Sequence, residues 1–241
     1  IPLRLVGSEM CIRDRHITLR DSTRIDATGQ TGGGEVYVGG GWQGGGDLPQ
    51  ATTVTLAQGA SIDASAIQKG DGGTVVVWSN IRDVTSQTRA YGEILAKGGA
   101  EGGNGGRVET SGRWLDLAGV KVDASAARGQ SGEWLLDPGN INIVSAADDR
   151  SITNSNEYVP GADTTIANGT IQAVLNVGTN VNIFTGPGGD YDITIASNVV
   201  ISKSAGTDAT LTLKATRNIT FSSGSSINSS SGKLGVVLWS D

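Results

Sequence analysis

The feature of this sequence that most constrains its fold is a unit that occurs four times in its first half. Each unit begins with a short segment led by Ile or Val, passes through a glycine-rich or small-residue turn, and ends in a run of mostly apolar residues. The paired segments are 25–27 with 32–38, 62–65 with 72–77, 94–96 with 102–110, and 122–125 with 131–136. Their first apolar residues are 37, 32 and 28 positions apart. Each unit therefore predicts two strands joined by a turn of variable length.

The composition agrees with stacked turns. The chain has 37 glycines among 241 residues but only 5 prolines. Glycine reaches positive φ without strain, and its lack of a Cβ lets neighbouring turns approach closely. The glycines cluster in twos and threes, which excludes the every-third-residue pattern of collagen. Hydrophobic residues make up 37% of the chain and occur in alternating runs, so the composition argues against disorder.

The second half shows strand-like alternation about every ten residues, separated by turn formers such as 204–208. The apolar members of these alternating runs are Ile193 and Ile195, Val199 and Ile201, Leu211 and Leu213, Ile219 and Phe221, and Leu234, Val236 and Leu238. Thr, Ser, Lys and Asn occupy most of the positions between them. Such alternation places one face inward and one in water.

One short helix is expected at Ile171–Asn176, with Thr170 as its N-cap and Gly178 ending it. Two helical turns cannot cover a sheet, so a βαβ architecture is rejected. Strand spacing alone fits a sandwich, a barrel or a solenoid, but the fourfold unit favours a solenoid. The sequence thus predicts an all-β parallel solenoid: glycine-rich repeats over 16–144, an insertion or boundary loop over 145–168, and a continuation over 169–241.

The first fifteen residues differ from the rest. They contain Met10 and Cys11, the only Met and the only Cys of the chain. The stretch VGSEMCIRDR, Val6–Arg15, resembles a translated sequencing adapter, so we interpret 1–15 as a leader that is not native. The remaining chain then has no cysteine, which suits an exported bacterial protein.

Three later segments carry a family resemblance. They are GQSGEWLLDP followed by NINI at 129–143, IQAVLNVGTNVNI at 171–183, and a set of strand-like runs from 208 to 238. Together with the repeated units, these segments resemble the filamentous-haemagglutinin family of two-partner-secreted exoproteins. The resemblance covers nearly everything after residue 20, and its Trp-Leu-Leu-Asp-Pro segment is its most specific part.

The resemblance implies a right-handed parallel β-helix that forms the shaft of a large adhesin. It also implies export through an outer-membrane partner transporter and a location outside the cell or on the bacterial surface. The implied roles are cell adhesion or contact-dependent competition, with a surface receptor or glycan as the partner. The chain lacks the Asn-Pro-Asn-type motifs of the family's secretion domain, so it is expected to be an internal shaft fragment.

No catalytic residue, cofactor or metal site is expected. His16 is the only histidine, so nucleophile systems that need a His base cannot form, and zinc would lack its usual ligands. The net charge is −6 and Lys and Arg do not cluster, which argues against a nucleic-acid partner. No apolar run approaches the roughly 20 residues that span a bilayer.

Two alternatives stay open. Calcium could bind turn carboxylates at Asp148 and Asp149 or at Asp190 and Asp192, although solvated turn carboxylates are the expectation. The run 98–106 resembles a calcium-binding repeat but lacks its regular aspartate.

The second alternative is a carbohydrate-active β-helix enzyme with paired carboxylates, and Asp26, Asp63 and Asp123 recur at one place in three units. Because a position repeated in each unit usually serves a corner, we expect these aspartates to cap turn amides. The five tryptophans are expected in packing roles rather than as a carbohydrate platform. Binding would use exposed loops at Gly39–Gln50 and Ala147–Asn168.

Overall fold

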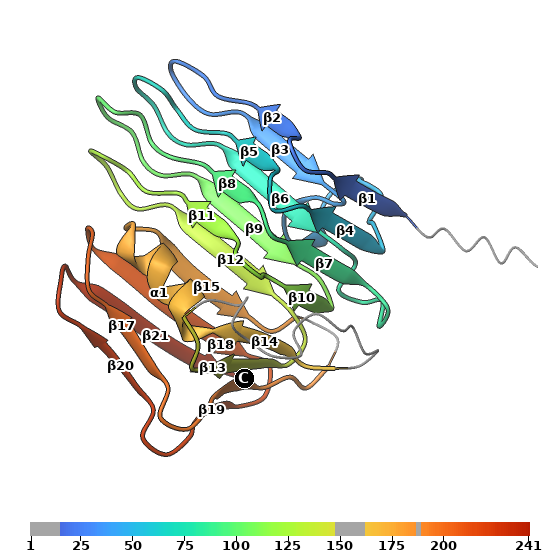
Figure 1. The fold of residues 1–241 in the computed structure, drawn as a ribbon, viewed down its shortest axis with the longest axis vertical. Helices are drawn as coiled ribbons and strands as arrows, with labels where there is room; N and C mark the ends of the chain where they lie inside the picture. Colours follow the sequence, from blue (N-terminus) through green and yellow to red (C-terminus); the bar gives the residue numbers. More distant parts are fainter. Residues whose placement is uncertain (1–14, 148–161, 187–188) are drawn as a thin grey trace, which may run out of the picture.

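The computed structural model describes residues 15–147, 162–186 and 189–241 (Figure 1). The described chain is mostly β-strand in parallel sheets, with a single α-helix among the described residues. The predicted leader falls outside the described residues except for Arg15, whose carbonyl accepts hydrogen bonds from the Thr52 and Thr53 amides.

Successive strands in the first half visit three sheets in turn. We call each set of three consecutive strands a rung. The rungs are β1 (His16–Leu19), β2 (Arg24–Asp26) and β3 (Glu35–Val38); β4 (Thr53–Leu56), β5 (Ser61–Asp63) and β6 (Thr74–Trp78); β7 (Gln87–Ala90), β8 (Glu93–Leu95) and β9 (Arg107–Ser111); and β10 (Trp114–Asp116), β11 (Lys121–Asp123) and β12 (Glu133–Asp137). The first sheet runs β1-β4-β7-β10, the second runs β2-β5-β8-β11, and the third includes β3-β6-β9-β12.

The register confirms the repeated unit. Ile25 pairs with Ile62, Ile62 pairs with Ile94, and Ile94 pairs with Val122, so the residues that open the four units are neighbours in the second sheet. Every strand pair in the sheets is parallel. The variable spacing of the units resides in the turns, because the strands keep their pairing.

Close stacking of the turns explains a column of glycines before the third sheet. A Cβ on Gly73 would lie 1.9 Å from the Gly34 carbonyl oxygen, one on Gly106 would lie 2.1 Å from the Gly73 oxygen, and one on Gly132 would lie 2.1 Å from the Gly106 oxygen. Real Cβ atoms do not approach oxygen so closely. Only glycine therefore fits at these three turns, as the sequence predicted for its glycine runs.

The order of strands changes after β12. The next elements are β13 (Ile141–Val144), β14 (Thr164–Ala167), α1 (Asn168–Asn176) and β15 (Asn180–Phe184). A sheet runs β14-β13-β16-β19, so β14 lies on the far side of β13 from the later strands. There it approaches β10, and the Leu115 amide donates to Thr164 Oγ1 (3.1 Å). The described end of the predicted loop 145–168 is thus a strand and the first residue of a helix.

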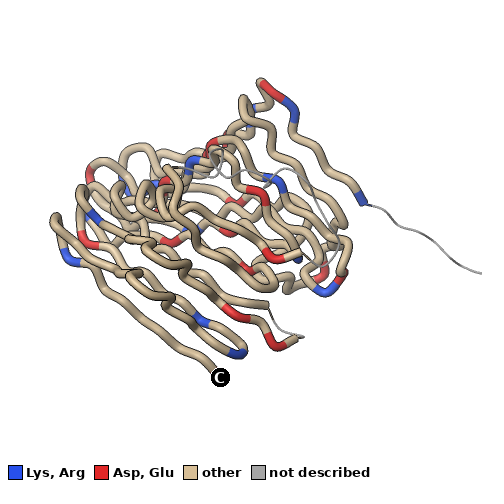
Figure 2. The backbone as a smooth tube through the Cα atoms, turned by 60° about the horizontal axis from the view of Figure 1, so that its bottom comes forward, with Lys and Arg blue, Asp and Glu red and all other residues tan. Residues whose placement is uncertain are grey.

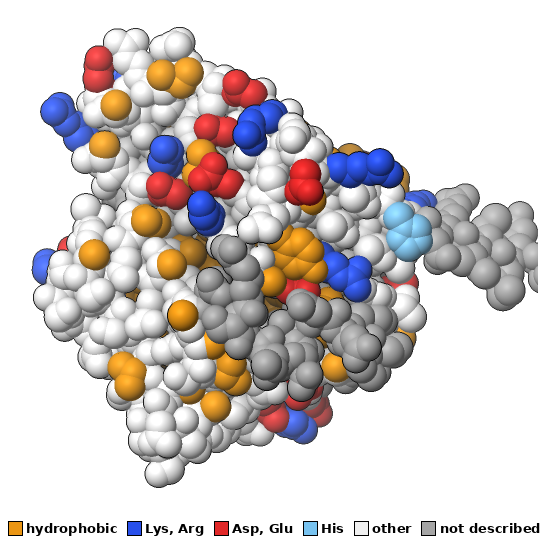
Figure 3. Space-filling view, viewed as in Figure 1, with side chains coloured by type: hydrophobic (Ala, Val, Ile, Leu, Met, Phe, Trp, Pro, Cys, Tyr) orange, Lys and Arg blue, Asp and Glu red, His pale blue; other side chains and the backbone are white. Residues whose placement is uncertain are grey.

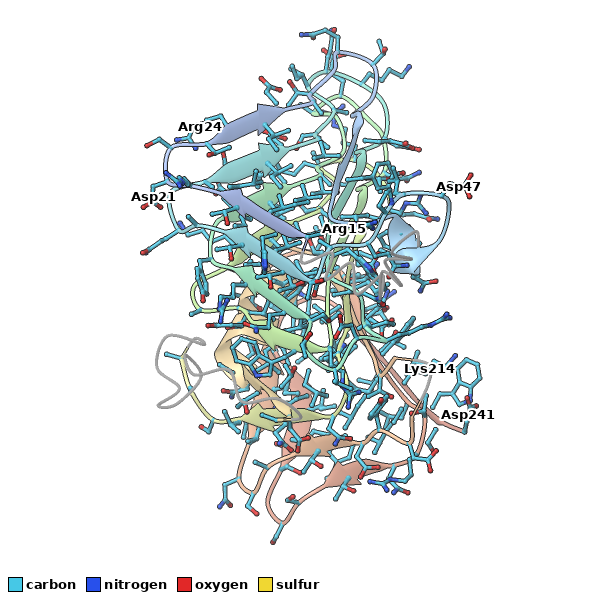
Figure 4. All side chains as sticks on the ribbon, turned by 90° about the vertical axis from the view of Figure 1, so that its right-hand side faces the viewer. Arg15, Asp21, Arg24, Asp47, Lys214 and Asp241 are labelled. Atoms are coloured by element: carbon cyan, nitrogen blue, oxygen red, sulfur yellow. The ribbon has the colours of Figure 1, made fainter. Side chains whose placement is uncertain are left out.

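The chain then resumes three-strand rungs. These comprise β16 (Ile193–Ile195), β17 (Val200–Lys203) and β18 (Ala209–Ala215), then β19 (Ile219–Phe221), β20 (Ser226–Ser229) and β21 (Leu234–Ser240). The third sheet continues through β15, β18 and β21 to seven strands, joining the regions 16–144 and 169–241 into one sheet. Figure 4 shows the rungs stacked along one long direction.

α1 occupies the place in its rung that the second strand has in the others. It begins three residues before the expected Ile171, and the prediction of Thr170 as N-cap was wrong, because Ala167 holds that position without a side-chain bond. The side chain of Asn168 explains the early start: it accepts from the Ala146 amide (3.0 Å) and donates to the Val200 carbonyl (2.6 Å). Gly178, at φ +85°, ends the helix as predicted.

The core runs through the inside of the stack. Its inward residues form columns in the order of the rungs, such as Val75, Val108, Trp134 and Val181 in the third sheet, all fully buried. Of the alternating residues expected in the second half to face inward, Ile193, Ile195, Val199, Ile201, Leu211 and Leu213 are fully buried in the same core. Those of the last rung are not buried: Phe221, Val236 and Leu238 are 39%, 44% and 49% exposed. Each fully buried side chain contributes about 1.5–3 kcal/mol of transfer free energy.

Candidate functional site

The repeated aspartates sit at corners and cap turn amides, as expected. The Thr28 amide donates to Asp26, the Ser65 amide to Asp63 and the Ser125 amide to Asp123, each at 2.9 Å. Leu95 lies between Asp63 and Asp123 in the sheet, so the three carboxylates do not form one row. Asp26 and Asp63 are register partners on the neighbouring strands β2 and β5, and each of the three aspartates accepts from an amide of its own turn.

The calcium candidates divide between two regions. Asp148 and Asp149 lie outside the described residues. Asp192 forms an ion pair with Arg217 and accepts from the Asn218 amide, and these contacts hold its pKa below the usual value. Within the described ranges no three His, Cys, Asp or Glu side chains come together in an arrangement that could hold a metal ion.

The loop Gly39–Gln50 folds over the outer face of the third sheet. Trp42 packs on the buried cluster of Val76, Trp78 and Ile81, and the Arg107 guanidinium stacks 4.7 Å from the Trp42 ring. Gln50 accepts from Trp78 Nε1 (3.3 Å). The tip of the loop remains exposed, and Figure 4 shows Asp47 there pointing away from the stack. Within Gly39–Gln50 only this tip can serve as an exposed binding loop, and most of the second predicted loop, Ala147–Asn168, lies outside the described residues.

Two carboxylates are buried on the covered face: Glu109 is 0% exposed and Asp137 is 6% exposed. Glu109 accepts from the Gln43 amide (2.7 Å) and from Ser111 Oγ (2.8 Å). Asp137 Oδ1 is buried and has no hydrogen-bond partner among the described residues. Burial raises the pKa of Glu109 to about 7, and burial together with the nearby Glu109 charge raises the pKa of Asp137 to about 7.

Paired carboxylates with raised pKa values are the groups that glycosidases use. A polysaccharide must touch such groups, however, and the Gly39–Gln50 loop lies over Glu109. The pair was missed in the sequence because outward strand positions were expected to be solvated. Glu109 is covered by the loop that contains residue 43, which is 66 positions before it in the sequence. No local pattern around Glu109 signals such a distant contact.

A concave surface lies beside α1. This α1 groove, of about 330 Å³, runs between β8, β11 and the helix, and Val120, Val122, Ala173 and Val174 line its apolar part. Val177, which is 43% exposed, connects it to a neighbouring groove of about 320 Å³ that Ile67 and Ala127 help to line. Figure 3 shows hydrophobic side chains over α1 next to basic and acidic side chains over β8 and β11. The volumes of these two grooves lie at the lower end of the range for ligand pockets.

The tryptophans pack mostly as predicted. Trp78, Trp114 and Trp134 are at most 5% exposed, and Trp134 Nε1 donates to Thr110 Oγ1 (3.0 Å). Trp239 is the exception at 53% exposed, because it lies on the outer face of β21, where Lys214 Nζ is 3.9 Å from its ring.

The distribution of charged residues and the length of the helices are relevant to binding of nucleic acids and membranes. Figure 2 shows Lys and Arg interspersed with Asp and Glu along the described chain. None of the helices in the described ranges has the length and apolar character needed to cross a membrane. No protein-family model matches this chain, and a search of curated proteins finds no match.

Proposed function

We propose that the chain is a right-handed parallel β-helix that serves as a structural shaft segment of a secreted, surface-displayed bacterial exoprotein of the filamentous-haemagglutinin type. The observation that carries this proposal is the seven-stranded parallel sheet, whose register continues from β3 to β21 across the helix-containing rung. A stack built from nearest-neighbour rungs gives length with a small core cross-section.

The surface chemistry supports a structural role. The repeated aspartates bond to turn amides, the buried Glu109 lies under the Gly39–Gln50 loop, and most tryptophans are packed. The side chains left to the outer faces are chiefly Thr, Ser, Asn and charged residues of both signs. Adhesion or contact-dependent competition, and export by an outer-membrane transporter, follow in this proposal from the resemblance of the 129–143 and 171–183 segments.

The proposal is tested on bacteria that produce the gene product. Antibodies against 16–241 should label intact cells, and labelling should disappear when the gene of the partner transporter is deleted. Beads coated with the purified chain should bind target cells more than beads coated with an unrelated β-helix. Labelling that persists without the transporter would contradict the export route.

The rival function as a carbohydrate-active enzyme is tested with the same purified chain. It should release no product from pectin-like and host glycans. If the parent chain released product and the Asp63→Asn variant, or a folded Glu109→Gln variant, did not, the chain would be an enzyme and not a structural shaft.

A further inference from the structure

The Gly39–Gln50 loop covers part of the outer face of the third sheet. Its Gln43 amide donates to Glu109 Oε2 (2.7 Å). A Cβ on Gly40 would lie 2.3 Å from Trp78 Cδ1, so the loop backbone rests directly on that ring. The loop thus buries both a carboxylate and an aromatic side chain on a face that would otherwise meet solvent.

The backbone of the loop can change conformation between ends that stay together. The Ala51 amide donates to the Gly39 carbonyl (2.8 Å), which closes the base of the loop. Gly44 and Gly46 have φ values of +66° and +76° within it. Gln43 has a φ of +52°, which is a strained conformation for a residue with a Cβ. Opening of the loop would release this strain.

The carboxylate under the loop has no cation of its own. Glu109 is 0% exposed, and it forms no ion pair with a Lys, Arg or His of the described residues. Arg107 lies nearby, but its guanidinium stacks on the Trp42 ring. The other charged groups that act on Glu109 or respond to its charge, Glu133 and Asp137 of β12, are acidic. An ionised Glu109 is therefore costly under the closed loop, whereas water reaches it once the loop opens.

The sign of the pH effect follows from this difference in hydration. Burial raises the pKa of Glu109 to about 7 in the closed state, against about 4.3 for a solvated glutamate. The closed state thus holds more protons between these two pH values, so ionisation favours the open state. The ratio of open to closed loops should rise by roughly tenfold per pH unit over this interval and level off above it.

We propose that the Gly39–Gln50 loop is a pH-controlled cover, closed while Glu109 is protonated and opening when Glu109 ionises. Opening uncovers Val76 and Trp78, which are buried in the closed state. The loop therefore couples the exposure of an apolar outer face to pH. This device goes beyond the shaft role and does not depend on it.

Hydrogen exchange of the full 241-residue chain measures the opening, because the Gln43 amide exchanges when its bond to Glu109 breaks. The protection factor divides out the pH dependence of intrinsic exchange. Between pH 5 and pH 8 it should fall by roughly fifty- to hundredfold at Gln43. The fall should be the same in 0 and 1 M urea, since loop opening exposes far less surface than global unfolding.

One variant and one matched control test the role of the carboxylate. Glu109→Gln keeps the size of the side chain and an acceptor for the Gln43 amide but cannot ionise. Its protection factor at Gln43 should be equal at pH 5 and pH 8. Glu93→Gln changes an exposed carboxylate on β8 and should keep the pH dependence of the parent chain.

Three outcomes would overturn the proposal. One is equal protection of Gln43 at pH 5 and pH 8 in the parent chain. Another is a fall of the same size in a folded Glu109→Gln variant. The third is a fall that depends on urea in the same way as the central amides of β15, which would assign the exchange to global unfolding. The pH series and the urea comparison need no variant, so the test stands even where Glu109→Gln impairs folding.

Discussion

Lys203 is a fully buried lysine at the turn between β17 and β18. Its Nζ donates to the carbonyls of Ala205 (2.5 Å), Gly206 (3.2 Å) and Ser231 (2.8 Å), so it ties together the turns of two adjacent rungs. In the sequence, Lys203 follows Ile201 by two residues, and no local pattern there predicts its contacts. The three carbonyls that it serves come together only when the rungs stack.

Lys203→Met should lower the free energy of unfolding by about 3 kcal/mol, because three carbonyl oxygens lose their donor in a buried turn. Lys69→Met, which changes an exposed lysine, is the matched control and should change stability by less than about 0.5 kcal/mol. Urea denaturation followed by circular dichroism measures both. Equal stability of the two variants would show that water serves these carbonyls as well as the ammonium does.

The Asp137 carboxyl has a pKa of about 7 in the folded chain, against about 3.9 in an unfolded one. The folded state therefore holds more protons between pH 4 and pH 7. The free energy of unfolding falls as pH rises through this interval and levels off above it.

Asp137→Asn removes the buried charge, so the variant should be more stable than the parent at pH 8 by roughly 2 kcal/mol. The two should be nearly equal at pH 4, where the parent carboxyl is protonated. Thermal melts at both pH values measure this, with Asp47→Asn at the exposed loop tip as the control. A variant less stable than the parent at pH 8 would contradict the burial of an unpaired carboxylate.

At the scale of single elements, the sequence predicted the strands well and the helix partly. The repeated units and the alternating runs became register partners because apolar periodicity and turn glycines are local signals that agree with the stack. The N-terminal end of α1 was placed three residues late, because Asn168 bonds to residues 22 and 32 positions away. The buried Glu109 escaped notice for the same reason.

The amide side chains on α1 should carry measurable stability. Gln172→Ala should cost about 1 kcal/mol and should speed hydrogen exchange at the Ser202 amide, which loses its acceptor. Gln58→Ala, in an exposed turn, is the matched control and should change neither quantity. Unchanged exchange at Ser202 in Gln172→Ala would mean that this amide is protected by packing alone.

At the scale of the whole molecule, a rung is the unit that can be removed. Deleting 193–218 joins Asp192 directly to Ile219, the register partner of Ile193, so β19, β20 and β21 can take the places of β16, β17 and β18. This shortened chain should fold and unfold cooperatively. Deleting 193–205 leaves half a rung and should abolish cooperative unfolding, since nearest-neighbour contacts no longer match. Scanning calorimetry distinguishes the two; similar melts for both would contradict a stack of equivalent rungs.

The position of β14 between β10 and β13 also determines the order in which strands can assemble during folding. A chain that folds from its amino end can add the first four rungs one after another, each onto a finished edge. β13 emerges next, yet the strand that separates it from β10 begins only at Thr164. Assembly must therefore wait at this point until the chain has reached Ala167, 23 residues after Val144. The strand order thus predicts one pause in the otherwise sequential addition of rungs during folding.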